Sequence, residues 1–65
     1  GEKNSSVATL RFQHGRALYE LGRLDEARAE METALALRRE LTGPDSAASR
    51  QLAEALEKYF PRSAP

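Results

Sequence analysis

The sequence predicts an all-α fold in which two helices form a hairpin and a third helix caps it. Apolar residues recur at spacings of three and four along three segments, which is the pattern of amphipathic helices. Gly22 and the Gly43-Pro44 pair separate these segments, since glycine favours helix ends and proline cannot continue a helix. Small residues also recur in the first two segments, as close contact between two helix backbones requires.

The first predicted helix covers residues 6–21 and carries two apolar faces. A serine precedes it as N-cap, and Gly22 follows it as a left-handed C-cap. Phe12 and Tyr19 lie seven residues apart, roughly 140° around the helix from the main apolar stripe. A single neighbouring helix cannot pack against both faces. We therefore expect the main stripe to pack against the second helix and the aromatic pair to pack against something else. The stripe consists of Val7, Leu10, His14, Ala17, Leu18 and Leu21.

The second and third predicted helices cover residues 24–41 and 45–59. The second begins with an acidic turn at Asp25, and the third ends before Pro61. Residues expected to face the first helix from the second are Ala27, Met31, Ala34, Leu35 and Leu41. The third helix has one apolar arc backed by charged residues, which is typical of the polar cap that ends a helical array. Residues 1–5 and 61–65 are expected to be flexible ends of a single three-helix unit at 6–60.

The spacing of Gly15, Gly22, Ala27 and Ala34 resembles that of the tetratricopeptide repeat (TPR), a helix-turn-helix unit. Both backbone-contact positions of the repeat are kept, while most of its large residues are replaced. The positions of the repeat signature hold Arg11, His14, Gly15, Leu18, Ala27, Met31 and Arg39. Arg39 stands where the repeat has proline, which allows a longer second helix. The stretch Ala-Leu-Ala-Leu-Arg at 34–38, followed by Gly-Pro-Asp at 43–45, resembles the extended repeats of kinesin light chains and bacterial regulators.

The resemblance implies a non-catalytic protein-protein interaction module, formed as a fragment of a right-handed superhelix. We expect it to end a repeat array in a larger regulatory protein and to bind a protein or peptide through the face of the first helix. The positions that match the groove of the repeat are Thr9, Phe12, Arg16 and Tyr19. For Phe12 and Tyr19, three covers remain open: a ligand, another subunit or repeat, and the chain's own third helix. A self-association element, acting in homo-oligomerisation, is the alternative function.

Composition weighs against other functions. Lys+Arg and Asp+Glu each number 10, are interleaved, and give zero formal net charge, so neither nucleic acid nor a membrane is an expected partner. The chain has no cysteine and a single histidine, His14, so we expect no metal, no cofactor and no enzyme activity. His14 is interpreted as a core or half-buried side chain with a hydrogen-bond partner. In the absence of a signal or transmembrane pattern, the expected location is cytoplasmic.

Overall fold

The computed structural model describes residues 5–61, which form three helices joined by two short turns. These are α1 (Ser5–Glu20), α2 (Leu24–Thr42) and α3 (Ala47–Tyr59). The predicted all-α fold is confirmed for the described residues, and the predicted helix ends are correct to within about two residues.

The expectations for flexible ends fall largely on residues 1–4 and 62–65, which lie outside the described part of the chain. Among the described helices, none combines the length and apolar character needed to cross a membrane.

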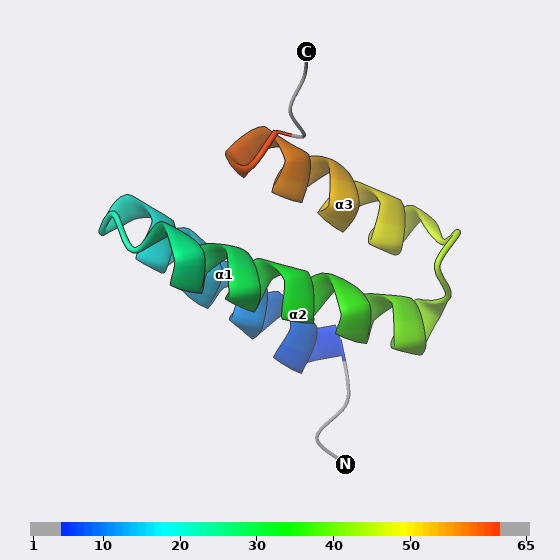
Figure 1. Ribbon diagram of the computed structural model, residues 1–65. Helices are drawn as coiled ribbons and strands as arrows, with labels where there is room; N and C mark the ends of the chain where they lie inside the picture. Colours follow the sequence, from blue (N-terminus) through cyan, green and yellow to red (C-terminus); the bar gives the residue numbers. More distant parts are fainter. Residues whose placement is uncertain (1–4, 62–65) are drawn as a thin grey trace.

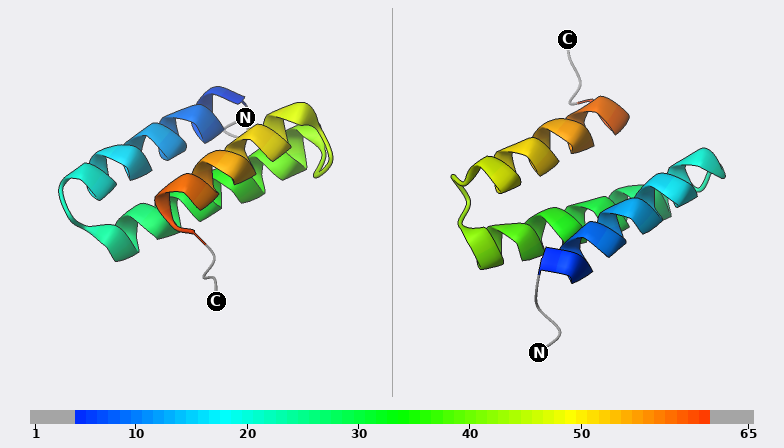
Figure 2. Two further views of the ribbon diagram at one scale, coloured as in Figure 1. Left: turned by 90° about the horizontal axis from the view of Figure 1, so that it is seen from above. Right: turned by 180° about the vertical axis from the view of Figure 1, so that it is seen from behind.

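α2 is the central helix of the fold. It runs antiparallel to α1, which lies behind it in Figure 1, and α3 then returns along α2 above the hairpin. The two further views in Figure 2 show that α3 follows α2 closely and that α1 flanks α2 on another side. Contact between α1 and α3 is therefore made by long side chains that reach across α2.

Glycines in the left-handed region end α1 and α2. Gly22 has φ 84° and Gly43 has φ 93°, values that L side chains rarely adopt. At the first turn, the backbone N–H of Arg23 donates to the carbonyl of Leu18 at 2.9 Å, which closes the end of α1.

The second turn is held by hydroxyl groups. Ser46 is the N-cap of α3, and its Oγ accepts the backbone N–H of Ser49 at 3.1 Å. Ser49 is the buried polar residue of this corner, and its hydroxyl donates to the carbonyl of Gly43 at 2.7 Å. The buried hydroxyl thus has a partner, and the start of α3 is tied to the end of α2.

α1 and α2 are in close contact at Gly15, as the sequence predicts. A Cβ at this position would lie 2.7 Å from Met31 Cγ and 3.1 Å from the Ala27 carbonyl oxygen. Ala27, Met31 and Ala34 are fully buried around this contact. The hairpin therefore depends on a position without a side chain in α1 and on small residues in α2.

The predicted apolar stripe of α1 is wrong for four of its six residues, whereas Leu18 is buried as predicted and Val7 is half-buried. Leu10 is 63% exposed and Leu21 is 71% exposed, and His14 and Ala17 are exposed as well. The residues of α1 that face the core, four or three positions apart, are Ala8, Phe12, Gly15, Leu18 and the half-buried Tyr19. The physical reason is the Gly15 contact, because the side of α1 that carries Gly15 must face α2. On α2, Ala27, Met31, Ala34 and Leu35 are buried as predicted, whereas Leu41 is exposed.

Replacing Gly15→Leu is expected to destabilise the hairpin by at least about 1 to 3 kcal/mol, since the new side chain overlaps Met31 and the Ala27 backbone. Chemical denaturation followed by circular dichroism measures this change. Gln13→Leu is the matched control, because Gln13 is an exposed residue of the same helix. Equal stability of the two variants would show that the close approach does not support the fold.

Candidate functional site

An aromatic cluster joins α3 to the hairpin. Tyr59 lies edge-on to Tyr19 with ring centroids 4.9 Å apart, and edge-on to Phe12 at 6.4 Å. Phe60 adds a second edge contact to Tyr19 at 5.5 Å. Edge-to-face pairs at such distances are favourable beyond the area that they bury. The cluster is thus the side-chain bridge by which α3 reaches α1.

Of the predicted partner-binding residues, two belong to this core. Phe12 is only 9% exposed and Tyr19 is half-buried, so both rings are largely covered within the chain itself. Of the three covers left open by the sequence, the structure shows the chain's own third helix. Thr9 and Arg16 remain exposed at the edge of the cluster, and Thr9 Oγ1 accepts a hydrogen bond from Arg38 Nη2 at 2.9 Å.

The uncovered apolar surface lies on the other side of the hairpin, and we call it the outer face. On α1 it contains Leu10, Ala17 and Leu21, which follow one another by seven and four residues and point roughly 140° to 180° away from Phe12. On α2 it contains the half-buried Leu37 and the exposed Leu41, spaced by four residues. Large leucines are thus exposed here while smaller residues form much of the core.

A polar cluster lies within the outer face and links its two helices. Arg11 Nη1 donates to Glu30 Oε1 at 2.9 Å, and His14 Nδ1 donates to Glu30 Oε2 at 2.5 Å. An ionised carboxylate only accepts hydrogen bonds, so the Nδ1 of His14 carries the proton. The hydrogen bond expected for His14 is therefore confirmed, whereas the expected burial is wrong, because its side chain is 60% exposed.

The same cluster changes the acidity of Glu30. The hydrogen bond from His14, followed by the hydrogen bond and charge of Arg11, lowers the pKa of Glu30 below its usual 4.5. Partial burial acts in the opposite direction but is outweighed. Glu30 is thus held as a carboxylate, and the cluster contains one fixed negative charge beside the positive charge of Arg11.

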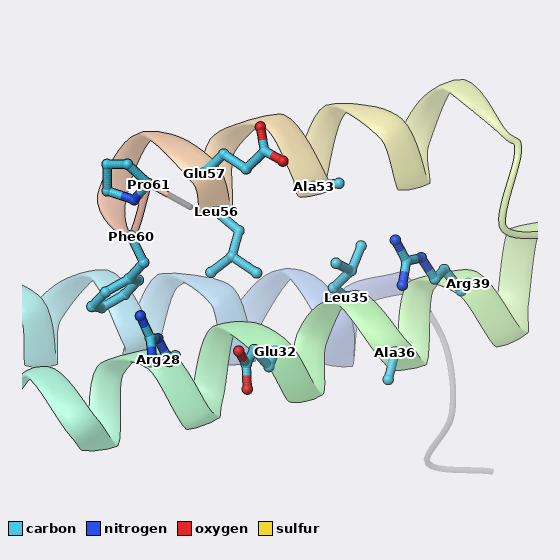
Figure 3. A pocket seen from close by; sticks show the side chains of 10 residues that line it. All are labelled: Arg28, Glu32, Leu35, Ala36, Arg39, Ala53, Leu56, Glu57, Phe60 and Pro61. Carbon is cyan, nitrogen blue, oxygen red and sulfur yellow. The ribbon is translucent and has the colours of Figure 1, made fainter. Parts of the chain in front are cut away.

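An open groove of about 600 Å³ lies between α2 and α3 on the side away from α1. Figure 3 shows Leu35 of α2 and Leu56 of α3 pointing into this groove from opposite sides. Arg39 lies at the end of the groove near the second turn. Arg28 lies at the opposite end, where its guanidinium carbon is 5.1 Å from the ring centroid of Phe60. Charged residues of both signs border the groove, and its apolar floor is continuous with the core.

The positions taken as structural repeat positions are placed as expected for a hairpin. Gly15 lies against Ala27 where α1 and α2 meet, Ala34 is fully buried in the core, and Gly22 ends α1 in the left-handed region. Within residues 5–61, no group of three or more His, Cys, Asp or Glu residues has the arrangement to hold a metal ion.

Comparisons with protein-family models, with curated proteins and with solved structures gave no match. The likeness to the TPR therefore rests on the spacing of residues in this chain.

Sequence reasoning missed the outer face and the groove beside α3. A signal for the outer face was present, because residues 8, 12, 15 and 19 share one side of a helix. Given that Gly15 faces α2, this spacing places Phe12 and Tyr19 inward and Leu10 and Leu21 outward. The groove had no comparable signal, since it depends on the angle between α2 and α3.

Replacing Phe12→Ser and Tyr19→Ser together is expected to detach α3 and cost more than about 3 kcal/mol of unfolding free energy, because both rings belong to the core. Urea unfolding followed by circular dichroism tests this. The matched control is Leu10→Ser with Leu21→Ser, two large and exposed residues of the same helix, measured on dilute protein. A stable, fully helical core variant would contradict the position of the aromatic pair.

The lowered pKa of Glu30 predicts a pH-dependent contribution to stability. The interaction stabilises the fold above pH 4.5, and its contribution is lost as the pH falls through the lower pKa of the folded state. Glu30→Gln should therefore flatten the fall in melting temperature on acidification. Glu32→Gln, at an exposed position of the same helix, should retain that fall. An unchanged acid profile in Glu30→Gln would show that the cluster does not stabilise the hairpin.

Proposed function

We propose that this chain is a cytoplasmic, non-catalytic protein-interaction module of the TPR type that binds a protein or peptide through α1. The observation that carries the proposal is the outer face, where Leu10 and Leu21 are 63% and 71% exposed while the smaller core is closed by α3. A contiguous apolar surface that is exposed on a monomer is typical of a site where another molecule binds.

The arrangement of the outer face suits a helical partner. Leu10, Ala17 and Leu21 form a straight stripe along α1, and Leu37 and Leu41 form a second stripe on α2. The shallow surface between two adjacent helices receives an amphipathic helix through apolar anchors spaced by three, four and seven residues. A helix of another protein, or a preceding repeat of a larger chain, has the required shape.

The surface of α3, on the opposite side of the molecule, supports the proposal that this three-helix unit ends a repeat array. The solvent-facing surface of α3 carries Arg50, Glu54, Glu57 and Lys58, all of them exposed. A terminal helix with a charged outer surface keeps the end of a repeat array in contact with water. The proposal therefore assigns α3 to the cap and the outer face to the junction with a partner.

Of the residues predicted to bind a partner, Arg16 keeps a side chain that is available beside the aromatic cluster. It is exposed, and its guanidinium could hold a carboxylate of a peptide that runs along the edge of α1. Phe12 and Tyr19 serve the proposed function indirectly, because they hold α3 and fix the orientation of α1. Thr9 is engaged by Arg38 and contributes to the same orientation.

Selection from a library of displayed helical peptides against the sparsely immobilised chain tests the proposal. Bound peptides should be amphipathic, and Leu10→Glu with Leu21→Glu should abolish their binding because charge replaces both anchors. Leu24→Glu is the matched control, since Leu24 is an exposed leucine outside the outer face and should leave binding unchanged. A library that yields no binder, or binders indifferent to the double substitution, would refute this use of the face.

A further inference from the structure

We propose that a second copy of this chain binds the outer face, forming a symmetric dimer in which the two α1 helices pack antiparallel. This inference rests on the proposed function, because it names a partner for the same face. A twofold-symmetric contact requires one surface to be complementary to itself. The order of residues along α1 meets that requirement.

The stripe of α1 reads Leu10, His14, Ala17, Leu21 in one direction. An antiparallel copy places Leu10 opposite the partner's Leu21 at each end of the contact. The same register places His14 opposite the partner's Ala17, so that a large side chain meets a small one at the centre. Large residues facing small ones allow two helices to interdigitate without overlap.

The charged groups of the polar cluster in the outer face are paired with one another within each copy. Glu30 is neutralised by Arg11 at 2.9 Å and receives a hydrogen bond from His14. Outside the outer face, near the turn at the end of α1, Arg23 and Glu26 form a further pair at 2.5 Å. The outer surface of α3, in contrast, exposes charged side chains to water and is a poor surface for an apolar contact.

The size of the face determines how strong the dimer is. A helix of 16 residues is about 24 Å long, and two adjacent helices are roughly 20 Å wide. The projected area of about 480 Å² is smaller than the roughly 800 Å² per partner of a standard stable complex. The dimer is therefore a reversible one whose population depends on protein concentration.

Sedimentation equilibrium of the full chain between about 1 μM and about 1 mM measures this population. The average mass should rise from 7.2 kDa toward twice that value. Leu10→Glu with Leu21→Glu should remain monomeric at every concentration and keep its helix content, because both leucines are exposed. Leu24→Glu should associate like the parent chain.

Disulfide trapping tests the register, since the chain has no cysteine of its own. A mixture of Leu10→Cys and Leu21→Cys chains should cross-link under mild oxidation several times faster than either variant alone. In the proposed dimer, position 10 of one copy lies about 16 Å along the helix axis from position 10 of the other, beyond the reach of a disulfide.

Three results would overturn the dimer: a parent chain that stays monomeric, a double glutamate variant that still associates, or single cysteine variants that cross-link as fast as the mixture. A monomeric parent chain whose outer face still binds displayed peptides would overturn the dimer alone and leave the proposed function standing. If the dimer forms but no displayed peptide binds the outer face, the result would contradict only the proposed binding of other proteins and would leave the dimer standing.

Discussion

The close approach of α1 and α2 at Gly15 is the constraint on which the rest of the structure depends. Because even a Cβ at this position would lie 2.7 Å from Met31 Cγ, no rotation of α1 that brings another residue to this point preserves the contact. The side of α1 that faces α2 is therefore determined, and two consequences follow. Phe12 and Tyr19 turn toward α3 and become core residues, whereas Leu10 and Leu21 turn toward solvent and form the outer face.

The resulting core is small for a chain of 65 residues without a disulfide. Alanines form much of its centre, and the attachment of α3 rests on edge contacts among Phe12, Tyr19, Tyr59 and Phe60 together with the hydroxyl network of Ser46 and Ser49. In such a domain the leucines of the outer face represent apolar area that another molecule can remove from water. Binding at that face would then add directly to the stability of the fold.

The polar cluster of Arg11, His14 and Glu30 gives the outer face its second property. It ties α1 to α2 at the surface and leaves the apolar stripe without an unpaired charge at its centre. An interface that contains a satisfied cluster of this kind avoids the cost of burying an isolated ion. The groove between α2 and α3 differs, because it is bordered by charges of both signs and its apolar floor continues into the core.

The sequence by itself determined the helices, their ends and the contact at Gly15, because helix periodicity, glycine at the turns and small residues act locally or between adjacent segments. The Gly15 contact carries a signal for which side of α1 is buried, but the sequence did not determine what covers Phe12 and Tyr19, since a ligand, another subunit and the third helix could each supply apolar contact. Only the tertiary structure decided this, because the position of α3 depends on the path of the turn at Gly43 and on packing between residues far apart in the chain. For the same reason, the predicted buried positions Leu10, Leu21 and Leu41 are exposed, whereas Phe12 and Tyr19, predicted to bind a partner, pack against α3.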